Sequence, residues 1–254
     1  MQTIIYDGSF NGWLSVVFDC YDYKFNDVQI CTRERFNGNI FERVHTTLTN
    51  EEHSERVLKG LRKKVSDEAI KQVYQTFLSE IAGIEDVLLR YVQYAFSGSL
   101  PIEQDFSNDD VLTVVQTAKK VWREKHRMEA FVRFQKTGDG LFYAIIDPDY
   151  NVLPLIAKHF TKRYADQRWM IYDSKRKYGI FYDGHSCSEI SVEFSVGLDS
   201  GENITTHYDE DETIYQELWK RYFASVNIAA RKNTKLHLQH MPRRYWKYLV
   251  EKQV

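Results

Sequence analysis

The chain has 254 residues, of which 43% are hydrophobic and 15% aromatic, a composition that predicts a folded core and excludes a disordered chain. Its formal net charge is −2, and no apolar run approaches the roughly 18 residues of a membrane-spanning helix. The N-terminus shows no signal-peptide pattern and the three cysteines are widely spaced, so we expect a cytoplasmic protein with reduced thiols and no membrane contact.

The first hundred residues are predicted to be mostly helical after a small β entry. Residues 3–6 are apolar and lead into Asp7-Gly8, which is typical of a strand that ends in a tight turn. Ser9 is a typical N-cap for a helix that ends near residue 23. Further strands are expected over residues 28–31 and 43–46, and further helices over residues 49–65 (capped by Thr49), 67–81 and 84–96.

A long helix is predicted to begin after Asn108, a residue type that caps helices. Apolar residues at helical spacing are expected to mark its buried side, namely Val111, Leu112, Val115, Ala118, Val121 and Trp122.

The second half has patterns typical of strands. Residues 130–135 and 141–146 flank Gly138-Asp139-Gly140, which predicts a β-hairpin. A helix over residues 155–164 is followed by strands over 169–172, 179–182 and 189–194, and then by a helix over 214–226.

The predicted fold class is therefore α+β. A helical N-terminal half with a small β entry precedes a mainly antiparallel β-β-α-β-β-β sheet, which C-terminal helices close. The predicted regions are residues 1–105 and 106–254, and the weak seam at 98–108 also allows one continuous domain.

Charge is segregated along the chain. Residues 116–187 hold 14 Lys and Arg against 8 Asp and Glu, and residues 218–254 hold nine against one. Residues 188–217 contain nine acids and no Lys or Arg. This separation predicts either a basic face or an acidic segment that folds against a basic one and neutralises it.

Two segments combine cations with aromatic rings: residues 126–134 (HRMEAFVRF) and residues 240–248 (HMPRRYWKY). Guanidinium groups and large rings serve phosphate and base recognition, but they also close a protein core. Neither segment contains a recognisable nucleophile, metal cluster or phosphate loop. The residues therefore indicate a kind of partner, nucleic acid, and we assign no catalytic residue, metal or cofactor.

Anchors along nearly the whole chain carry a family resemblance. They are Tyr6-Asp7-Gly8-Ser9-Phe10-Asn11-Gly12, His126-Arg127-Met128, Phe131-Val132-Arg133-Phe134, Asp147-Pro148, His159-Phe160, Arg163-Tyr164, Trp169, Leu218-Trp219, Tyr222, Ser225, Ala230-Arg231-Lys232-Asn233 and Met241-Pro242-Arg243-Arg244-Tyr245-Trp246-Lys247. On these residues the chain resembles a bacterial family of DNA-metabolism and DNA-repair proteins whose own activity is unassigned.

The resemblance implies DNA and a protein as partners. Members typically occur beside a radical S-adenosylmethionine protein proposed to act in DNA modification or repair, and some are fused to a uracil-DNA glycosylase domain. The cysteine triplet of a radical enzyme is absent from this sequence, so such chemistry would belong to the partner. Two departures alter local geometry: Ile228-Ala229-Ala230-Arg231 replaces an Asn-Pro-Ala-Arg run, and Tyr172-Asp173-Ser174-Lys175 replaces a Thr-Pro turn.

In that context nine residues are candidates for nucleic-acid contacts: His126, Arg127, Arg133, Arg163, Arg231, Arg243, Arg244, Tyr245 and Trp246. Arg243 and Arg244 would contact phosphates while Tyr245 or Trp246 stacks on an unpaired base. Alternatively, the two rings anchor the tail in the core and the arginines lie in solvent, which suits a helix that starts at Pro242.

The remaining candidates carry alternatives of their own. His126 and Arg127 lie near the end of the long helix, so a phosphate clamp or general acid competes with simple stabilisation of the helix dipole. Arg133, predicted on a strand, is expected to face a ligand or an acidic neighbour such as Asp147. His159 is expected to be a packed histidine, and the pair His237 and His240 lacks the further ligands that a metal needs.

Three functions follow from these observations. The favoured one is a nucleic-acid-associated accessory protein that works with a radical S-adenosylmethionine enzyme. The second is an enzyme acting on a damaged base or a phosphodiester, with His126, Arg127, Arg133 and Asp147 converging on a pocket. The third is an interaction scaffold whose acidic residues 188–217 form a docking surface.

Overall fold

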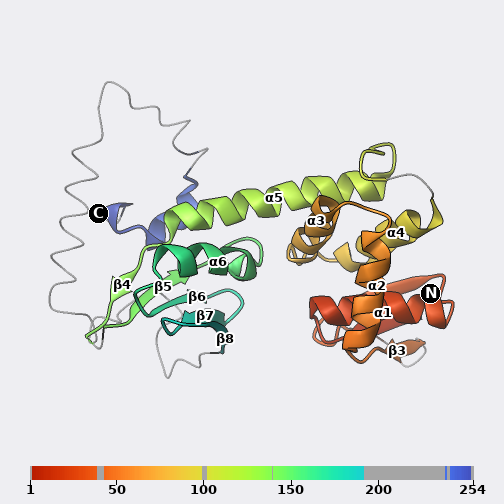
Figure 1. The fold of residues 1–254 in the computed structure, drawn as a ribbon, viewed down its shortest axis with the longest axis horizontal. Helices are drawn as coiled ribbons and strands as arrows, with labels where there is room; N and C mark the ends of the chain where they lie inside the picture. Colours follow the sequence, from red (N-terminus) through yellow and green to blue (C-terminus); the bar gives the residue numbers. More distant parts are fainter. Residues whose placement is uncertain are drawn as a thin grey trace. The chain divides into compact units, whose positions relative to one another are not determined.

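The computed structural model describes residues 2–38, 43–98, 102–138, 140–191, 238 and 241–252. These residues form an α+β fold, as predicted (Figure 1). The chain divides into two compact units, Met1–Trp122 and Arg123–Val254, which we call unit 1 and unit 2. Their boundary falls within the long helix α5 (Asp109–Phe131), downstream of the seam that the sequence suggests.

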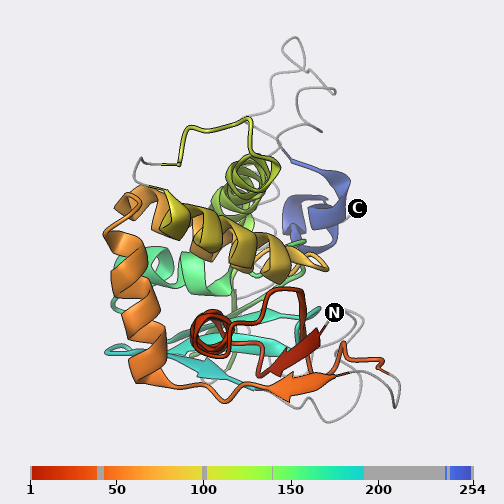
Figure 2. The same ribbon diagram turned by 90° about the vertical axis from the view of Figure 1, so that its right-hand side faces the viewer.

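Unit 1 is built on a three-stranded parallel sheet. Strand β1 (Gln2–Tyr6) lies between β2 (Val28–Thr32) and β3 (Val44–Thr46), so all three predicted strands form. Parallel neighbours need a crossover connection, which α1 (Phe10–Asp22) supplies between β1 and β2. Figure 2 shows α1 nearly end-on beside β1.

The junction of β1 and α1 follows the predicted turn and cap. Gly8 has a φ of +84°, and Ser9 Oγ accepts a hydrogen bond from the Gly12 amide at 2.9 Å. Asp7 accepts hydrogen bonds from the Ser9 amide and from Thr49 Oγ1, at 2.9 and 2.6 Å. Burial raises the pKa of Asp7, but these hydrogen bonds outweigh it, so the net pKa is lowered.

The other helices of unit 1 are α2 (Glu51–Arg62), α3 (Asp67–Phe77) and α4 (Ile84–Ser97). The prediction that Thr49 caps α2 was wrong, because Thr49 is engaged with Asp7 and the next residue, Asn50, accepts from the His53 amide at 3.1 Å. The core of unit 1 is apolar and includes Ile4, Trp13, Leu14, Leu61, Val73, Leu88, Val92 and Val111.

Helix α5 begins as predicted, with Asn108 Oδ1 accepting from the amides of Asp110 and Val111. Its buried stripe differs in part from the prediction and consists of Val111, Val114, Thr117, Ala118, Val121, Glu124 and Met128. Trp122 is 50% exposed, because it lies one position beyond the stripe. The stripe thus includes a buried carboxylate, Glu124.

Unit 2 contains a five-stranded sheet in the order β4-β5-β6-β7-β8. The elements are β4 (Gln135–Lys136), β5 (Phe142–Ile146), α6 (Leu153–Arg163), β6 (Trp169–Asp173), β7 (Tyr178–Tyr182) and β8 (Cys187–Ile190). This is the predicted β-β-α-β-β-β order. Only β5 and β6 pair in parallel, because α6 connects them; all other pairs are antiparallel.

Strand β4 is much shorter than the predicted strand over residues 130–135. Helix α5 continues to Phe131, and the Val132 amide still donates to the Met128 carbonyl at 3.1 Å. Met128 and Val132 are both buried and lie four residues apart, on one face of a helix. Their burial therefore favours the helix over the predicted strand. Arg133 therefore lies in the connection before β4 and not on a strand.

The described C-terminal residues form two short 3₁₀ helices, η3 (Arg243–Tyr248) and η4 (Val250–Lys252). Tyr245, Leu249 and Val250 are buried. The predicted helix over residues 214–226 lies outside the described residues. Among the helices that the structure describes, none is long and apolar enough to cross a membrane.

Candidate functional site

Unit 2 contains a cavity of about 900 Å³. Its walls come from the end of α5, the connection to β4, helix α6 and the first residues of β5 and β6. Three of the nine residues predicted from the sequence line it: His126, Arg133 and Arg163. The structure thus gathers residues from three of the anchors of the family resemblance at one site.

Helical spacing and sheet register explain why these side chains meet. On α5, residues 126, 129 and 130 recur at intervals of three and four, so they share one face. On α6, His159 and Arg163 are four residues apart and share a face in the same way. Phe142 and Trp169 are register partners on the parallel strands β5 and β6.

Aromatic rings form much of the cavity wall: Phe134, Phe142, Phe160, Tyr164 and Trp169. Phe134 contacts three of the others edge-on or tilted, with ring centroids 5.3 Å from Tyr164, 5.6 Å from Phe160 and 6.2 Å from Trp169. Phe160 and Trp169 are buried, whereas Phe134, Phe142 and Tyr164 are half-buried. The three half-buried rings present aromatic surface to the cavity.

A carboxylate lies between two histidines in this wall. Glu129 is 3.6 Å from His159 Nδ1 and 3.8 Å from His126 Nδ1, and it also pairs with Lys125 at 2.6 Å. His159, predicted to be a packed histidine, is half-buried with its ring centroid 5.1 Å from that of Phe160, and it also lines the cavity. Its position beside Glu129 makes it a functional candidate that the sequence alone did not single out.

Arg133 is held by the C-terminal end of the chain. Its Nη2 donates to the Glu251 carboxylate at 2.9 Å, and the Glu251 side chain is 1% exposed. Val250, the neighbour of Glu251, lines the cavity. The acidic neighbour of Arg133 is therefore Glu251 and not Asp147, which pairs with Lys247 at 2.8 Å.

The basic C-terminal segment packs against α5. Tyr245 is 3% exposed and donates to the Glu124 carboxylate at 2.6 Å, and Arg244 pairs with the same carboxylate at 2.7 Å. Arg244 also pairs with Asp149. Burial, reinforced by the hydrogen bond to Glu124, raises the pKa of Tyr245. Tyr245 is thus an anchor in the core, and Arg244 is part of the same ionic network.

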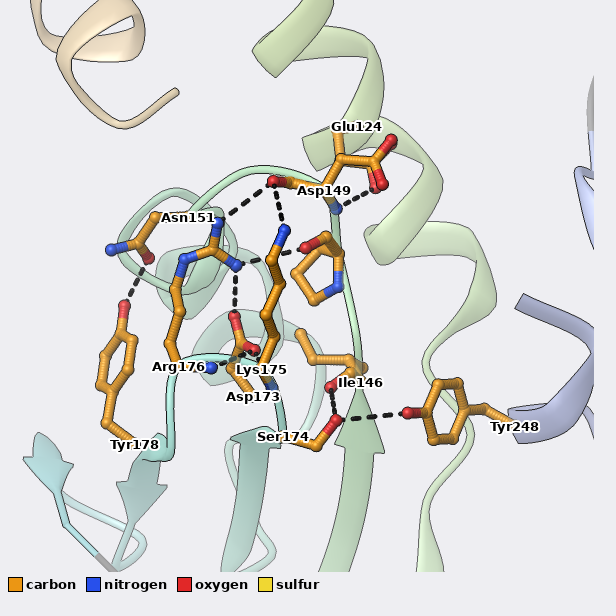
Figure 3. A network of polar contacts seen from close by, with 11 residues as sticks. Glu124, Ile146, Asp149, Asn151, Asp173, Ser174, Lys175, Arg176, Tyr178 and Tyr248 are labelled. Atoms are coloured by element: carbon orange, nitrogen blue, oxygen red, sulfur yellow. Dashed lines mark hydrogen bonds and ion pairs between the residues drawn. The ribbon is translucent and has the colours of Figure 1, made fainter. Parts of the chain in front are cut away.

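Figure 3 shows how this network continues into the loop after β5. Glu124 accepts from the Asp149 amide at 3.0 Å, and Arg176 donates to the carbonyls of Pro148 and Asp149. Arg176 also pairs with the fully buried Asp173 at 2.9 Å. Burial raises the pKa of Asp173, although the Arg176 charge opposes that shift. These contacts fix the loop against the sheet.

The other predicted residues lie elsewhere in unit 2. Arg127 Nη1 is 3.6 Å from Glu124, and Arg127 does not line the cavity. Arg243 is exposed, with its guanidinium 5.9 Å from the ring centre of Trp246, and the Trp246 indole donates to the Met241 carbonyl. Arg231, the pair His237 and His240, and most of the acidic segment lie outside the described residues.

Two acidic residues of unit 2, Glu124 and Glu129, were not predicted from the sequence. Glu124 lies three residues after Val121 and four before Met128, so an acid on the apolar stripe was a visible signal. Glu129 is four residues from Lys125, a spacing that predicts an ordinary surface ion pair and hides its link to α6.

Fold and site together define an α+β protein with a basic, aromatic cavity in its C-terminal unit. The family described as a domain of unknown function, DUF4130, matches residues 82–251, and the chain belongs to this family. Neither a curated protein nor a solved structure matches the chain.

Proposed function

We propose that the protein binds single-stranded nucleic acid in DNA metabolism and works with a radical S-adenosylmethionine partner enzyme. The observation that supports this proposal is the cavity of unit 2, where half-buried rings lie beside Arg163 and Lys136. Unpaired bases stack on aromatic rings without regard to sequence, and cations bind the phosphates between them.

The local charge supports the same proposal. Residues 116–187 contain every residue that lines the cavity except Val250. They hold 14 Lys and Arg against 8 Asp and Glu. Such an excess attracts a polyanion even though the whole chain is mildly acidic. The radical enzyme rests on the family resemblance alone, whereas the cytoplasmic setting rests on the N-terminal pattern and the spaced cysteines. Copurification of the two proteins at moderate salt would test that pairing.

Fluorescence anisotropy with labelled single- and double-stranded DNA over a salt series tests the nucleic-acid proposal. We expect tighter binding of the single strand and a steep loss of affinity with salt. The double variant Lys136→Glu/Arg163→Glu should weaken binding at least tenfold and flatten the salt slope.

The matched control is Lys158→Glu/Lys162→Glu, which makes the same charge change on exposed residues of α6 that do not line the cavity. It should cost much less affinity than the cavity variant. Equal losses in the two variants, or no binding at low salt, would contradict the proposal.

One observation favours a second candidate function, an enzyme acting on a damaged base or a phosphodiester. Glu129 lies within 4 Å of ring nitrogens of both His126 and His159, an arrangement that suits general acid–base chemistry. The discriminating observation is turnover: a binding protein returns its oligonucleotide intact, whereas an enzyme does not.

A further inference from the structure

The cavity has the size of a site for one small ligand. Its volume of about 900 Å³ lies within the roughly 300–1,000 Å³ typical of pockets that enclose a small molecule. A single nucleotide fits such a space, whereas a base pair within a duplex cannot enter it without being unstacked. The site therefore suits one nucleotide of a strand at a time.

Trp169, which lines the cavity, carries a hydrogen-bond donor without an acceptor among the described residues. The indole Nε1 of Trp169 is buried and finds no partner among the described residues, and the residue is 0% exposed. Leaving such a donor unpaired destabilises the folded state, so buried donors are rarely left in this state. An acceptor on a bound ligand would remove this penalty once the side chains around Nε1 move aside, because the indole has no exposed surface in this structure.

Stacking surface and cations lie around this donor. Phe134 contacts Trp169 and Tyr164, and the guanidinium of Arg163 is 5.8 Å from the ring centre of Tyr164. An arginine beside a stacking ring is suited to bind the phosphate of the same nucleotide whose base lies on the ring. His159, four residues before Arg163, adds a polar group that can reach a base edge.

We propose that this cavity binds a single unstacked nucleotide, with the base against Phe134 and Tyr164, an acceptor of the base on Trp169 Nε1 and the phosphate on Arg163. The inference rests on the proposed nucleic-acid function and identifies a single nucleotide as the part of the strand that is recognised. A purely apolar ligand would leave the indole donor and the cations unused, and inorganic phosphate would leave the rings unused.

Isothermal titration of the full chain with dAMP, dCMP, dGMP and dTMP tests the inference, with the matching nucleosides and inorganic phosphate as separate arms. We expect saturable binding of at least one nucleotide, weaker binding of its nucleoside, and little binding of phosphate alone. Arg163→Ala should weaken the nucleotide about tenfold and leave the nucleoside unchanged, because it removes only the phosphate contact.

Trp169→Phe retains the ring and removes the donor, so it should weaken nucleotide and nucleoside alike by about tenfold. Lys162→Ala, next to Arg163 but outside the cavity wall, should change neither. Because Trp169 is buried, circular dichroism must show that its variant is folded, and Phe134→Leu provides a second, less buried test of the base contact.

The outcomes distinguish failure of this inference from failure of the proposed function. If single-stranded DNA binds with a steep salt slope but no nucleotide or nucleoside binds at millimolar concentration, the single-nucleotide site is wrong and the general function stands. If neither DNA nor nucleotide binds, both are wrong. Nucleotide binding that Arg163→Ala and Phe134→Leu leave unchanged would also overturn the inference.

Discussion

Glu124 shows how one residue can organise a segment far from it in sequence. Its carboxylate accepts from Tyr245 and the Asp149 amide and pairs with Arg244, while its side chain is only 2% exposed. A buried carboxylate is costly unless it is paired, and here every described partner comes from the loop after β5, from the C-terminal segment or from Arg127. The basic C-terminal segment is therefore held in place by an acid.

We expect Glu124→Gln to lower the free energy of unfolding by about 3 kcal/mol, because it removes the buried charge that pairs with Arg244 and accepts from the buried Tyr245 hydroxyl. Urea denaturation followed by circular dichroism would measure the loss. Glu55→Gln, the same change at an exposed position of α2, should stay within about 0.5 kcal/mol of the parent protein. Similar effects at the two positions would show that the Glu124 network contributes nothing to stability.

At the scale of elements, the turn from β1 into α1 depends on a few short polar contacts. Ser9 Oγ caps α1 through the Gly12 amide, and Asp7 accepts from both Ser9 and Thr49. These contacts join the end of β1 to the residues before α2. The cap was predicted, whereas the role of Thr49 was not, because its partner lies 42 residues away.

Ser9→Ala should lower the free energy of unfolding by about 1 kcal/mol, since it removes the side-chain cap. Ser9→Thr keeps a hydroxyl at the same position and should retain most of the stability. Thermal or urea unfolding of the two variants side by side measures the difference. An alanine variant as stable as the threonine variant would rule out a contribution from the cap.

At the scale of the whole molecule, the described polar contacts of Ser9 and of Glu124 fall in different units. The partners of Ser9 all lie in unit 1, and the described partners of Glu124 all lie in unit 2. Energetic effects of substitutions without shared partners usually add.

The combined variant Ser9→Ala/Glu124→Gln should therefore lose the sum of the two single losses, within about 0.5 kcal/mol. The same urea denaturation series, run on parent, single and double variants, measures this. A deviation clearly above 0.5 kcal/mol would reveal energetic coupling between the units through α5, the helix they share.

Local patterns in the sequence determined much of the fold. Helical spacing, the caps at Ser9 and Asn108 and the turn residues placed most of the described elements, because these signals depend on neighbours within a few residues. The β-β-α-β-β-β order followed in the same way. The extent of α5 past residue 130 did not, because burial of Met128 and Val132 decided it.

Tertiary structure alone decided which contacts the candidate residues make. The basic, aromatic segments were visible in the sequence, but only packing shows that His126, Arg133 and Arg163 line one cavity while Arg244 and Tyr245 bind Glu124. The same residue types serve both tasks, and their partners lie up to 121 residues away. Such long-range pairing leaves no periodic trace in the sequence. The cavity, and the Trp169 donor that has no partner among the described residues, therefore became apparent only in the folded chain.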